Sequence, residues 1–278
     1  MNPASGQPYF CSMNSITTTM QKQMKAIEYT RYGSPEVLHL KDMPIPTPAP
    51  NEVLIRIHAT TATAADIMMR KGDPYIGRLY TGLNGPKRTI PGFEFAGEVV
   101  ETGSAVTLFK VGDKVFGGTT TLGCYAEYAC VSETDVLTTM PDNISYAEAA
   151  PVNGSAITVM NCLKGLGNIQ KGQRVLSNGA SGGLGTYAIQ IAKHYGAEVT
   201  GVCSTKNMAM VKSLGADHVI DYTHEDFTKL GIQYDIIFDT LGRRSFGDCK
   251  KALTTSGISL SAVMNIPPLF RRQRAKVF

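Results

Sequence analysis

Residues 177–207 read "SNGASGGLGTYAIQIAKHYGAEVTGVCSTKN" and carry four glycines within seven residues. Glycine at this density costs backbone entropy, which indicates that the backbone must approach another group closely. The run matches the dinucleotide fingerprint GxGxxG with alanine in the first place, which requires backbone N–H groups and a helix N-terminus to face a pyrophosphate. The alternative is that the glycines only allow tight packing of a strand against a helix. We predict a nucleotide-binding loop formed by Ala180, Ser181, Gly182, Gly183, Leu184 and Gly185.

The sequence around this loop alternates strand-like runs with helical patterns. "QRVLSNG" precedes the loop, and a helical stretch with an apolar stripe follows it. Upstream, Ser145 and Glu148 have the spacing of a capping box at the start of another helix. Further strand-like runs are "AEVTGVCS", "HVIDY", "YDIIFDT" and "GISLSAV". This alternation predicts βαβ units and a parallel sheet over residues 148–266.

Residues 24–147 show a different residue pattern, which predicts short strands interrupted by Gly and Pro. In "NEVLIRIHAT" the apolar residues alternate, and "FEFAGEVVETG", "GDKVFGG" and "CYAEYACVS" repeat the pattern. This predicts an antiparallel barrel or sandwich. Residues 1–23 are rich in Ser, Thr, Asn and Gln, and we expect them to be a flexible leader.

Composition limits the classes of partner. The chain has 278 residues, of which 43% are hydrophobic and 18% charged, as is typical of a soluble globular protein. The formal charge of +4 is matched by four cations in the last eight residues, so the rest is neutral and indicates neither a nucleic-acid nor a membrane partner. The basic end, residues 267–278, is expected to be a solvated tail, with RNA binding as the weaker alternative. Six cysteines without CxxC spacing favour a reducing, cytoplasmic setting.

The end of the second strand of the parallel sheet indicates which dinucleotide binds. An NAD site usually has Asp or Glu there, on the ribose hydroxyls, whereas this chain has Cys203 followed by Ser204, Thr205 and Lys206. A hydroxyl and an ammonium would bind a 2′-phosphate, which a carboxylate would repel. We therefore predict NADPH. The alternative for Lys206 is an ordinary solvated lysine.

With a β domain in front and this loop behind, the motifs "PGFEFAGEVVETG", "GDKVFG" and "SLGADHVIDY" make the chain resemble the medium-chain dehydrogenase/reductase superfamily. Within it, the chain is similar to the zinc-free quinone oxidoreductase branch, which includes the zeta-crystallin-like reductases. The resemblance implies an α/β plus β fold, with a GroES-like β-barrel domain before a Rossmann-type doubly wound parallel sheet. It also implies hydride transfer from NADPH to a quinone or an α,β-unsaturated carbonyl, and a homodimer as one assembly.

The resemblance also bears on metals. Zinc-dependent members of the superfamily have a Cys ligand and a His ligand at the places that correspond to Thr63 and Phe93 in this chain. Neither residue binds zinc well, the lobe with four cysteines is missing, and the five histidines show no ligand spacing. We expect no metal. Without a Lewis acid, reduction of an acceptor that itself delocalises charge is easier than alcohol oxidation.

Carried over by motif position, the resemblance assigns Ser181, Gly182, Gly183 and Leu184 to the pyrophosphate, and Ser204, Lys206 and Tyr222 to the 2′-phosphate. Thr63 stands where relatives commonly have Asn beside the nicotinamide, and Asp66 follows at the shared spacing. Asp66 could equally cap the helix after it. Tyr75 could face the substrate or donate a proton, or could be a loop tyrosine with a packed ring and a solvated hydroxyl.

Relatives continue beyond this terminus, so we expect the fold to be C-terminally shortened. "IPPLFRRQRAKVF" contains two prolines and a basic octet, which predict neither a strand nor a buried helix. We expect the sheet edge at the fifth strand to be uncovered. The alternative function is therefore a catalytically impaired NADPH-binding protein that acts as a sensor or an interaction module.

Overall fold

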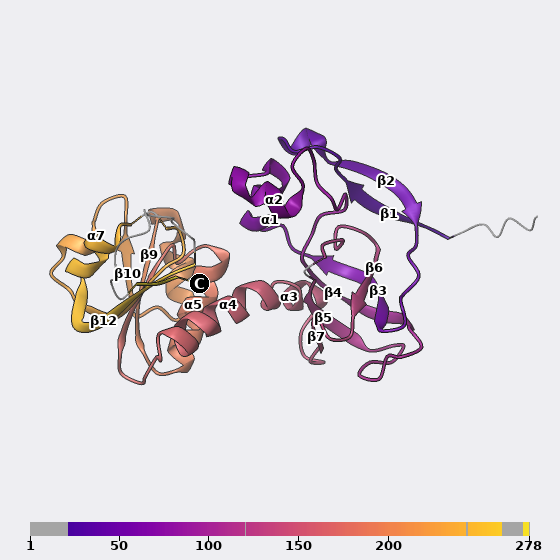
Figure 1. Ribbon diagram of the computed structural model, residues 1–278. Helices are drawn as coiled ribbons and strands as arrows, with labels where there is room; N and C mark the ends of the chain where they lie inside the picture. The colour runs from indigo at the N-terminus through magenta and orange to yellow at the C-terminus, as the bar shows by residue number, and fades with distance from the viewer. Residues whose placement is uncertain (1–21, 120, 243, 263–274, 278) are drawn as a thin grey trace, which may run out of the picture.

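The computed structural model describes residues 22–119, 121–242, 244–262 and 275–277. Two bodies are joined by a run of short helices, with the first half of the chain in one and the second half in the other (Figure 1). Nearly all of the expected leader lies outside the described residues, and the first strand begins at Gln23.

The first body is a β domain of antiparallel strands, as the alternating pattern predicts. Its main sheet has the order β6-β3-β4-β5-β7, and a separate hairpin, β1-β2, meets it at the bridge between Ala26 and Ala126. The strands are β1 (Gln23–Glu28), β2 (His39–Pro44), β3 (Glu52–Thr60), β4 (Glu94–Thr102), β5 (Lys114–Gly118), β6 (Tyr128–Ser132) and β7 (Val136–Thr139). A short helix, η1 (Pro35–Val37), lies between β1 and β2. A helical excursion between β3 and β4 contains α1 (Ala64–Lys71), η2 (Tyr75–Gly77) and α2 (Arg78–Thr81).

A helical bridge, residues 146–166, connects the two bodies (Figure 1). Ser145 begins it with the predicted capping box, because its hydroxyl accepts from the Glu148 N–H and the Glu148 carboxylate accepts from the Ser145 N–H. The bridge contains two π-helical turns, so it is not one regular helix. Its parts are α3 (Tyr146–Ala149), η3 (Val152–Ala156), α4 (Ile157–Met160) and η4 (Asn161–Leu166).

The second body is a six-stranded parallel sheet with the order β10-β9-β8-β11-β12-β13. Numbered along this domain, the order is 3-2-1-4-5-6, that of the doubly wound Rossmann fold, which confirms the predicted class. Its strands are β8 (Arg174–Asn178), β9 (Glu198–Cys203), β10 (His218–Asp221), β11 (Tyr234–Asp239), β12 (Leu253–Ser261) and β13 (Ala275–Val277). Its helices are α5 (Gly183–His194), η5 (Thr205–Asn207), α6 (Met208–Ser213), η6 (Phe227–Lys229) and α7 (Phe246–Lys251).

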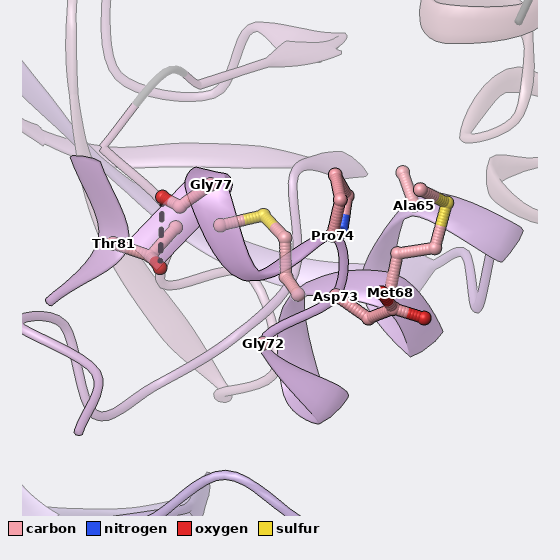
Figure 2. Close-up of a pocket in the computed structure, with 8 residues that line it drawn as sticks. Ala65, Met68, Gly72, Asp73, Pro74, Gly77 and Thr81 are labelled. Carbon is pink, nitrogen blue, oxygen red and sulfur yellow. Dashed lines mark hydrogen bonds between the residues drawn. The ribbon is translucent and has the colours of Figure 1, made fainter. Parts of the chain in front are cut away.

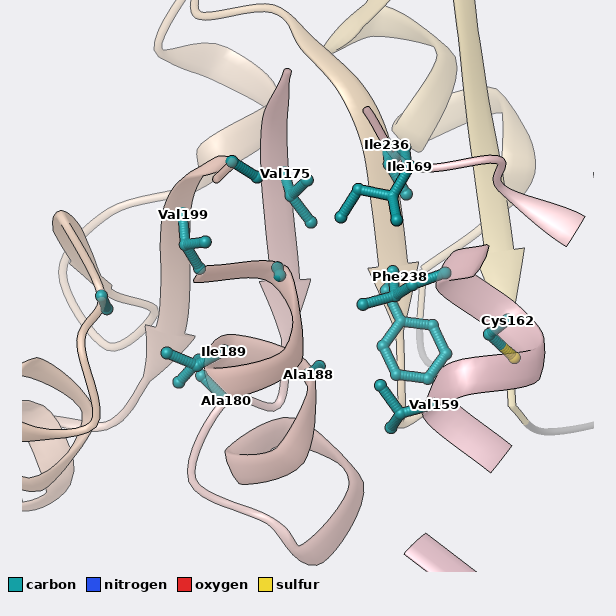
Figure 3. Packing of buried hydrophobic residues seen from close by; sticks show 14 of the residues in the cluster. Val159, Cys162, Ile169, Val175, Ala180, Ala188, Ile189, Val199, Ile236 and Phe238 are labelled. Carbon is teal, nitrogen blue, oxygen red and sulfur yellow. The ribbon is translucent and has the colours of Figure 1, made fainter. Parts of the chain in front are cut away.

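The parallel sheet is buried on both faces. On one face α5 packs Ala188 and Ile189 against Val175 of β8, while the bridge packs Val159 against Phe238 of β11 (Figure 3). The other face buries a second cluster, which includes Leu176, Ile237, Phe227 and Cys249. Successive residues of each central strand enter opposite clusters, which explains why these strands read as continuous apolar runs.

The tail departs from the expectation drawn from its composition. Ala275–Val277 form β13, which pairs with Ser259–Ser261 of β12, so the C-terminal end of the fifth strand is covered at its edge. Strand pairing uses main-chain groups, so three residues with a lysine in the middle can add to an open edge without an apolar pattern. Residues 267–274 lie outside the described residues. None of the helices in the described part of the chain combines the length and apolar character that crossing a bilayer demands.

Candidate functional site

The glycine-rich loop leaves β8 and places the N-terminus of α5 at the carboxyl edge of the parallel sheet. Gly179 makes the turn with a φ of 86°, which favours glycine. Gly182 is the N-cap residue of α5, and no side chain caps this helix. The first N–H groups of a helix have no partner within it, so α5 offers donors and the positive end of its dipole to an anion.

The glycines of the loop have two different roles. A Cβ on Gly185 would overlap Gly179 O and lie 2.7 Å from Ala180 Cα, so this glycine allows the helix to pack on the loop. A Cβ on Gly182 would meet only Gly179 O at 3.4 Å, and one on Gly183 only Ser155 Oγ at 3.5 Å. A Cβ on Gly182 or Gly183 would therefore make only ordinary van der Waals contacts, and the residues of the loop leave room for a pyrophosphate.

The loop lies at the switch point of the sheet, where β8 and β11 are neighbours. Asn178 Nδ2 donates to Asp239 Oδ1 at 2.9 Å, and this pair is buried. Thr240 donates from N and from Oγ1 to Asn178 O at 3.1 and 2.9 Å. These bonds hold the ends of the two strands together at the place where doubly wound folds bind their ligands.

The three residues predicted for the 2′-phosphate gather at the same sheet edge. Ser204 is the N-cap residue of η5, which contains Lys206. Tyr222 N donates to Cys203 O at 3.1 Å, so the residue after β10 lies beside the end of β9. The Tyr222 side chain is 59% exposed and is free to contact a ligand.

Asp221, the last residue of β10, holds the segments at this sheet edge together through hydrogen bonds. It accepts hydrogen bonds from Thr205 Oγ1, from Thr223 N at 2.9 Å and from Thr223 Oγ1 at 2.7 Å. These bonds, chiefly the one from Thr205, lower the pKa of Asp221 to about 2. The carboxylate thus ties the segment of Lys206 to the segment that follows β10.

Asn207 is a site residue that the sequence analysis missed. Its Nδ2 donates to Ser181 Oγ at 3.0 Å and to Ser204 Oγ at 3.4 Å. It therefore joins the predicted pyrophosphate loop to the predicted 2′-phosphate segment. The only signal in the sequence was an amide side chain one residue after Lys206, which is weak.

In the β domain, Thr63 and Asp66 are brought into direct contact at the start of α1. Asp66 Oδ2 accepts from Thr63 N at 2.8 Å and from Thr63 Oγ1 at 2.6 Å, while Asp66 N donates to Thr63 Oγ1 at 3.3 Å. This is a capping box, so the helix-capping alternative for Asp66 describes its contacts. A role of either residue beside a nicotinamide stays a prediction.

Two tyrosines respond to the charge on Asp66, which is 8% exposed. Burial raises the pKa of Tyr29 to about 12, and the nearby Tyr32 and Asp66 add to the shift. Burial and the Asp66 carboxylate also raise the pKa of Tyr125. Both phenols therefore remain protonated at neutral pH and are able to donate hydrogen bonds.

Tyr75 lies at the start of η2 with a side chain that is 71% exposed. The Arg78 guanidinium lies 4.4 Å from the centre of its ring and 4.5 Å from that of Tyr32. The ring thus makes a cation–π contact with Arg78 and is otherwise largely exposed, so these contacts do not decide between the two alternatives for Tyr75. A catalytic role for Tyr75 is untested by these contacts.

An apolar pocket of about 220 Å³ opens between α1 and the η2–α2 turn. Figure 2 shows its walls, with Met68 and Ala65 on the helix side and Pro74 and Gly77 on the turn side. A Cβ on Gly77 would meet no atom within 4 Å. The pocket is lined by Ala65, Met68, Met69, Gly72, Asp73, Pro74, Gly77 and Thr81.

Two family models match this architecture. Residues 49–142 match the alcohol dehydrogenase GroES-like domain, and residues 183–262 match the domain described as zinc-binding dehydrogenase. The solved quinone oxidoreductase from Coxiella burnetii is 33% identical, with a TM-score of 0.77 over 88% of this chain and 77% of that chain. The chain belongs to the quinone oxidoreductase branch of the medium-chain dehydrogenase/reductase superfamily.

Two relatives of the chain are named as a reductase and an oxidoreductase. The 2-methylene-furan-3-one reductase of Solanum lycopersicum is 36% identical over 82% of this chain. The NADPH-dependent alkenal/one oxidoreductase of Arabidopsis thaliana is 34% identical over 90% of it. The chain spans 60% and 64% of the length of these two relatives.

Thr63 and Phe93 stand where metal-dependent members of the superfamily have zinc ligands, and both make other contacts in this chain. Thr63 is engaged with Asp66, and Phe93 O accepts from Thr119 N at 2.8 Å. Within the described ranges, no three His, Cys, Asp or Glu side chains are close enough together to hold a metal ion.

Proposed function

We propose that this protein is a zinc-independent, NADPH-dependent oxidoreductase that reduces a quinone or an α,β-unsaturated carbonyl. The observation that carries the proposal is the uncapped start of α5, where Gly182 and Gly183 leave the backbone accessible at the switch point of the sheet. The printed names of its reductase relatives support the reaction class.

The residues of the loop would hold the dinucleotide as follows. The N–H groups at the start of α5, with Ser181 beside them, bind the pyrophosphate, because this end of the helix is free and positive. Ser204, Lys206 and Tyr222 bind the 2′-phosphate with a hydroxyl, an ammonium and a phenol. The preference for NADPH over NADH rests on these three side chains.

The β domain provides the residues that would contact the electron acceptor. When bound, the reduced nicotinamide supplies the hydride. Thr63 offers a hydroxyl that Asp66 orients, and the apolar pocket that begins at Ala65 suits an acceptor with apolar substituents. Thr63 and Phe93 are poor zinc ligands, so the acceptor itself must delocalise the charge that arrives with the hydride.

The experiment that tests the proposal measures NADPH oxidation by the purified chain with a panel of quinones and enones, with and without a zinc chelator. We expect turnover with NADPH, little with NADH, and no effect of the chelator. Equal turnover with both dinucleotides would contradict the assignment of the phosphate site. Binding of NADPH without turnover of any acceptor would contradict the proposed enzymatic activity and support a nucleotide-binding role alone.

Two further expectations belong to this proposal. A cytoplasmic location rests on the spacing of the cysteines, and the five cysteines in the described residues are free. A homodimer rests on the resemblance. Both stay predictions, which fractionation and sedimentation of the native protein would test.

A further inference from the structure

Glu94 is a buried carboxylate outside the predicted site. It lies at the start of β4 with 6% of its surface exposed. Thr61 Oγ1 donates to Glu94 Oε2 at 2.5 Å, and the main-chain N–H of Gly154 donates to the same carboxylate. Burial raises the pKa of Glu94, and these two hydrogen bonds only oppose the shift. Burying a carboxylate is unfavourable unless hydrogen bonds compensate, so the contacts of Glu94 with Thr61 and Gly154 are what keep it in place.

The contact with Gly154 crosses from the β domain to the helical bridge. Gly154 lies in the π-helical turn η3 of the bridge. A Cβ on this residue would overlap Glu94 Oε1, so the carboxylate fits against the backbone only because residue 154 is glycine. The side chain of Glu94 thus meets the main chain of the bridge directly.

The neighbours of Gly154 reach both bodies of the protein. Asn153 Nδ2 lies against Gly118 of β5, where a Cβ would overlap it. Ser155 Oγ lies 3.5 Å from the position of a Cβ on Gly183, the first residue of α5. Asn153 and Gly154 of the bridge therefore contact the β domain, and Ser155, the next residue, lies near the start of α5.

We propose that Glu94 is a positioning residue that fixes the bridge to the β domain and thereby places Ser155 at the open start of α5. This inference rests on the proposed binding of NADPH at that loop. Loss of the bond to Gly154 frees η3 to move, and a small displacement of Ser155 relative to Gly183 changes the surroundings of the proposed pyrophosphate site, which is enough to weaken binding. Glu94 acts through Gly154 and Ser155 and does not itself touch the dinucleotide.

The test compares E94A with E94Q in NADPH titrations followed by nicotinamide fluorescence, with the thermal midpoint as a check on folding. The amide of E94Q is able to accept from Gly154 N and to donate to Thr61 Oγ1, so both contacts survive. We expect E94A to weaken NADPH binding about five- to tenfold and E94Q to bind like the unmodified protein. E98A, on the same strand and paired with Arg56 at the surface, is the matched control and should bind normally.

A second variant keeps the proposal testable if E94A does not fold. G154A retains the carboxylate but places a Cβ on it, so it should weaken NADPH binding as E94A does. In the double variant the two losses should not add, since both changes break one contact.

Normal NADPH binding by a folded E94A, or equal losses in E94A and E94Q, would overturn the positioning role. Absence of NADPH binding by the unmodified protein would instead overturn the proposed function, so the two failures are distinguishable.

Discussion

The side chain of Asn207 donates a hydrogen bond to Ser181 Oγ at 3.0 Å and so connects two segments that are 26 residues apart in the sequence. One end of this bond lies in the glycine-rich loop and the other follows the second strand of the parallel sheet. This amide group therefore connects the loop proposed to bind the pyrophosphate to the segment proposed to bind the 2′-phosphate.

Replacing Asn207 by Ala should weaken NADPH binding about two- to tenfold, because Ser181 and Ser204 lose a shared donor. The dissociation constant from nicotinamide fluorescence measures the effect. Asn51→Ala removes a comparable surface bond, to Ser132 at 3.5 Å, and should change nothing. Unchanged binding in Asn207→Ala would show that the two subsites are held in place by other contacts.

Gly182→Ala and Gly185→Ala should separate binding from stability. Gly182 has an extended backbone that alanine adopts, and its Cβ would only touch Gly179 O at 3.4 Å, so this variant should fold normally and lose most of its NADPH affinity. The Cβ of Gly185→Ala would press on Gly179 and Ala180, which should lower the free energy of unfolding by about 1–3 kcal/mol. Urea unfolding and NADPH titration of both variants check the contrast, and tight NADPH binding by Gly182→Ala would contradict it.

Lys206→Ala should reduce the affinity for NADPH about tenfold or more and leave the affinity for NADH unchanged, because only the 2′-phosphate loses a charged donor. Parallel titrations with the two dinucleotides give the ratio. Lys250→Ala, an exposed lysine on α7, is the control. A parallel loss for NADH would indicate that Lys206 supports the fold of η5 and does not select the dinucleotide.

Gly77→Leu should fill the apolar pocket beside α1. The backbone of Gly77 is helical, with φ of −61°, and its surroundings leave room for a side chain. We expect the KM for an enone with a long alkyl chain to rise several-fold, and the KM for its shortest homologue to stay unchanged. Equal effects on both enones would place the acceptor elsewhere.

The stability of E94Q relative to the unmodified protein should depend on pH. The pKa of Glu94 is raised above its usual value of 4.5 in the folded state, so the protonated form favours folding. Its contribution to stability is present below the usual pKa and is lost as the pH rises through the raised pKa. E94Q does not titrate there, so its advantage in the free energy of unfolding should grow from about pH 4.5 to neutral pH. A constant difference in urea unfolding across this range would contradict the raised pKa.

Local patterns in the sequence predicted the fold well. The glycine-rich loop, the capping box at Ser145 and the change from alternating to helical rhythm all depend on residues close in the chain, and the structure confirms them. The adjacency of β8 and β11 is a property of the whole sheet that no local pattern encodes. The pairing of β13 was missed because main-chain bonding to an edge leaves no apolar pattern.

Site residues that belong to a sequence motif could be predicted. Site residues that are defined by a contact with a distant part of the chain could not. The loop and Ser204, Lys206 and Tyr222 were found by position, and the structure brings them to one edge. Asn207 and Glu94 were missed, because the partners Ser181 and Gly154 are 26 and 60 residues away, and only folding reveals them. The sequence left two roles for Asp66, and helix capping was one of them. The hydrogen bond from Thr63 Oγ1 to Asp66 shows the capping contact.

The buried bond between Asn178 and Asp239 joins positions 61 residues apart, and it has a consequence for the order of folding. The glycine-rich loop follows Asn178 directly, but its floor is complete only when β11 has docked beside β8. Closing such a distant pair is slow relative to forming a helix. We therefore expect the proposed nucleotide to bind late in folding, so that the nicotinamide signal would report the completion of the sheet and not the formation of the loop itself.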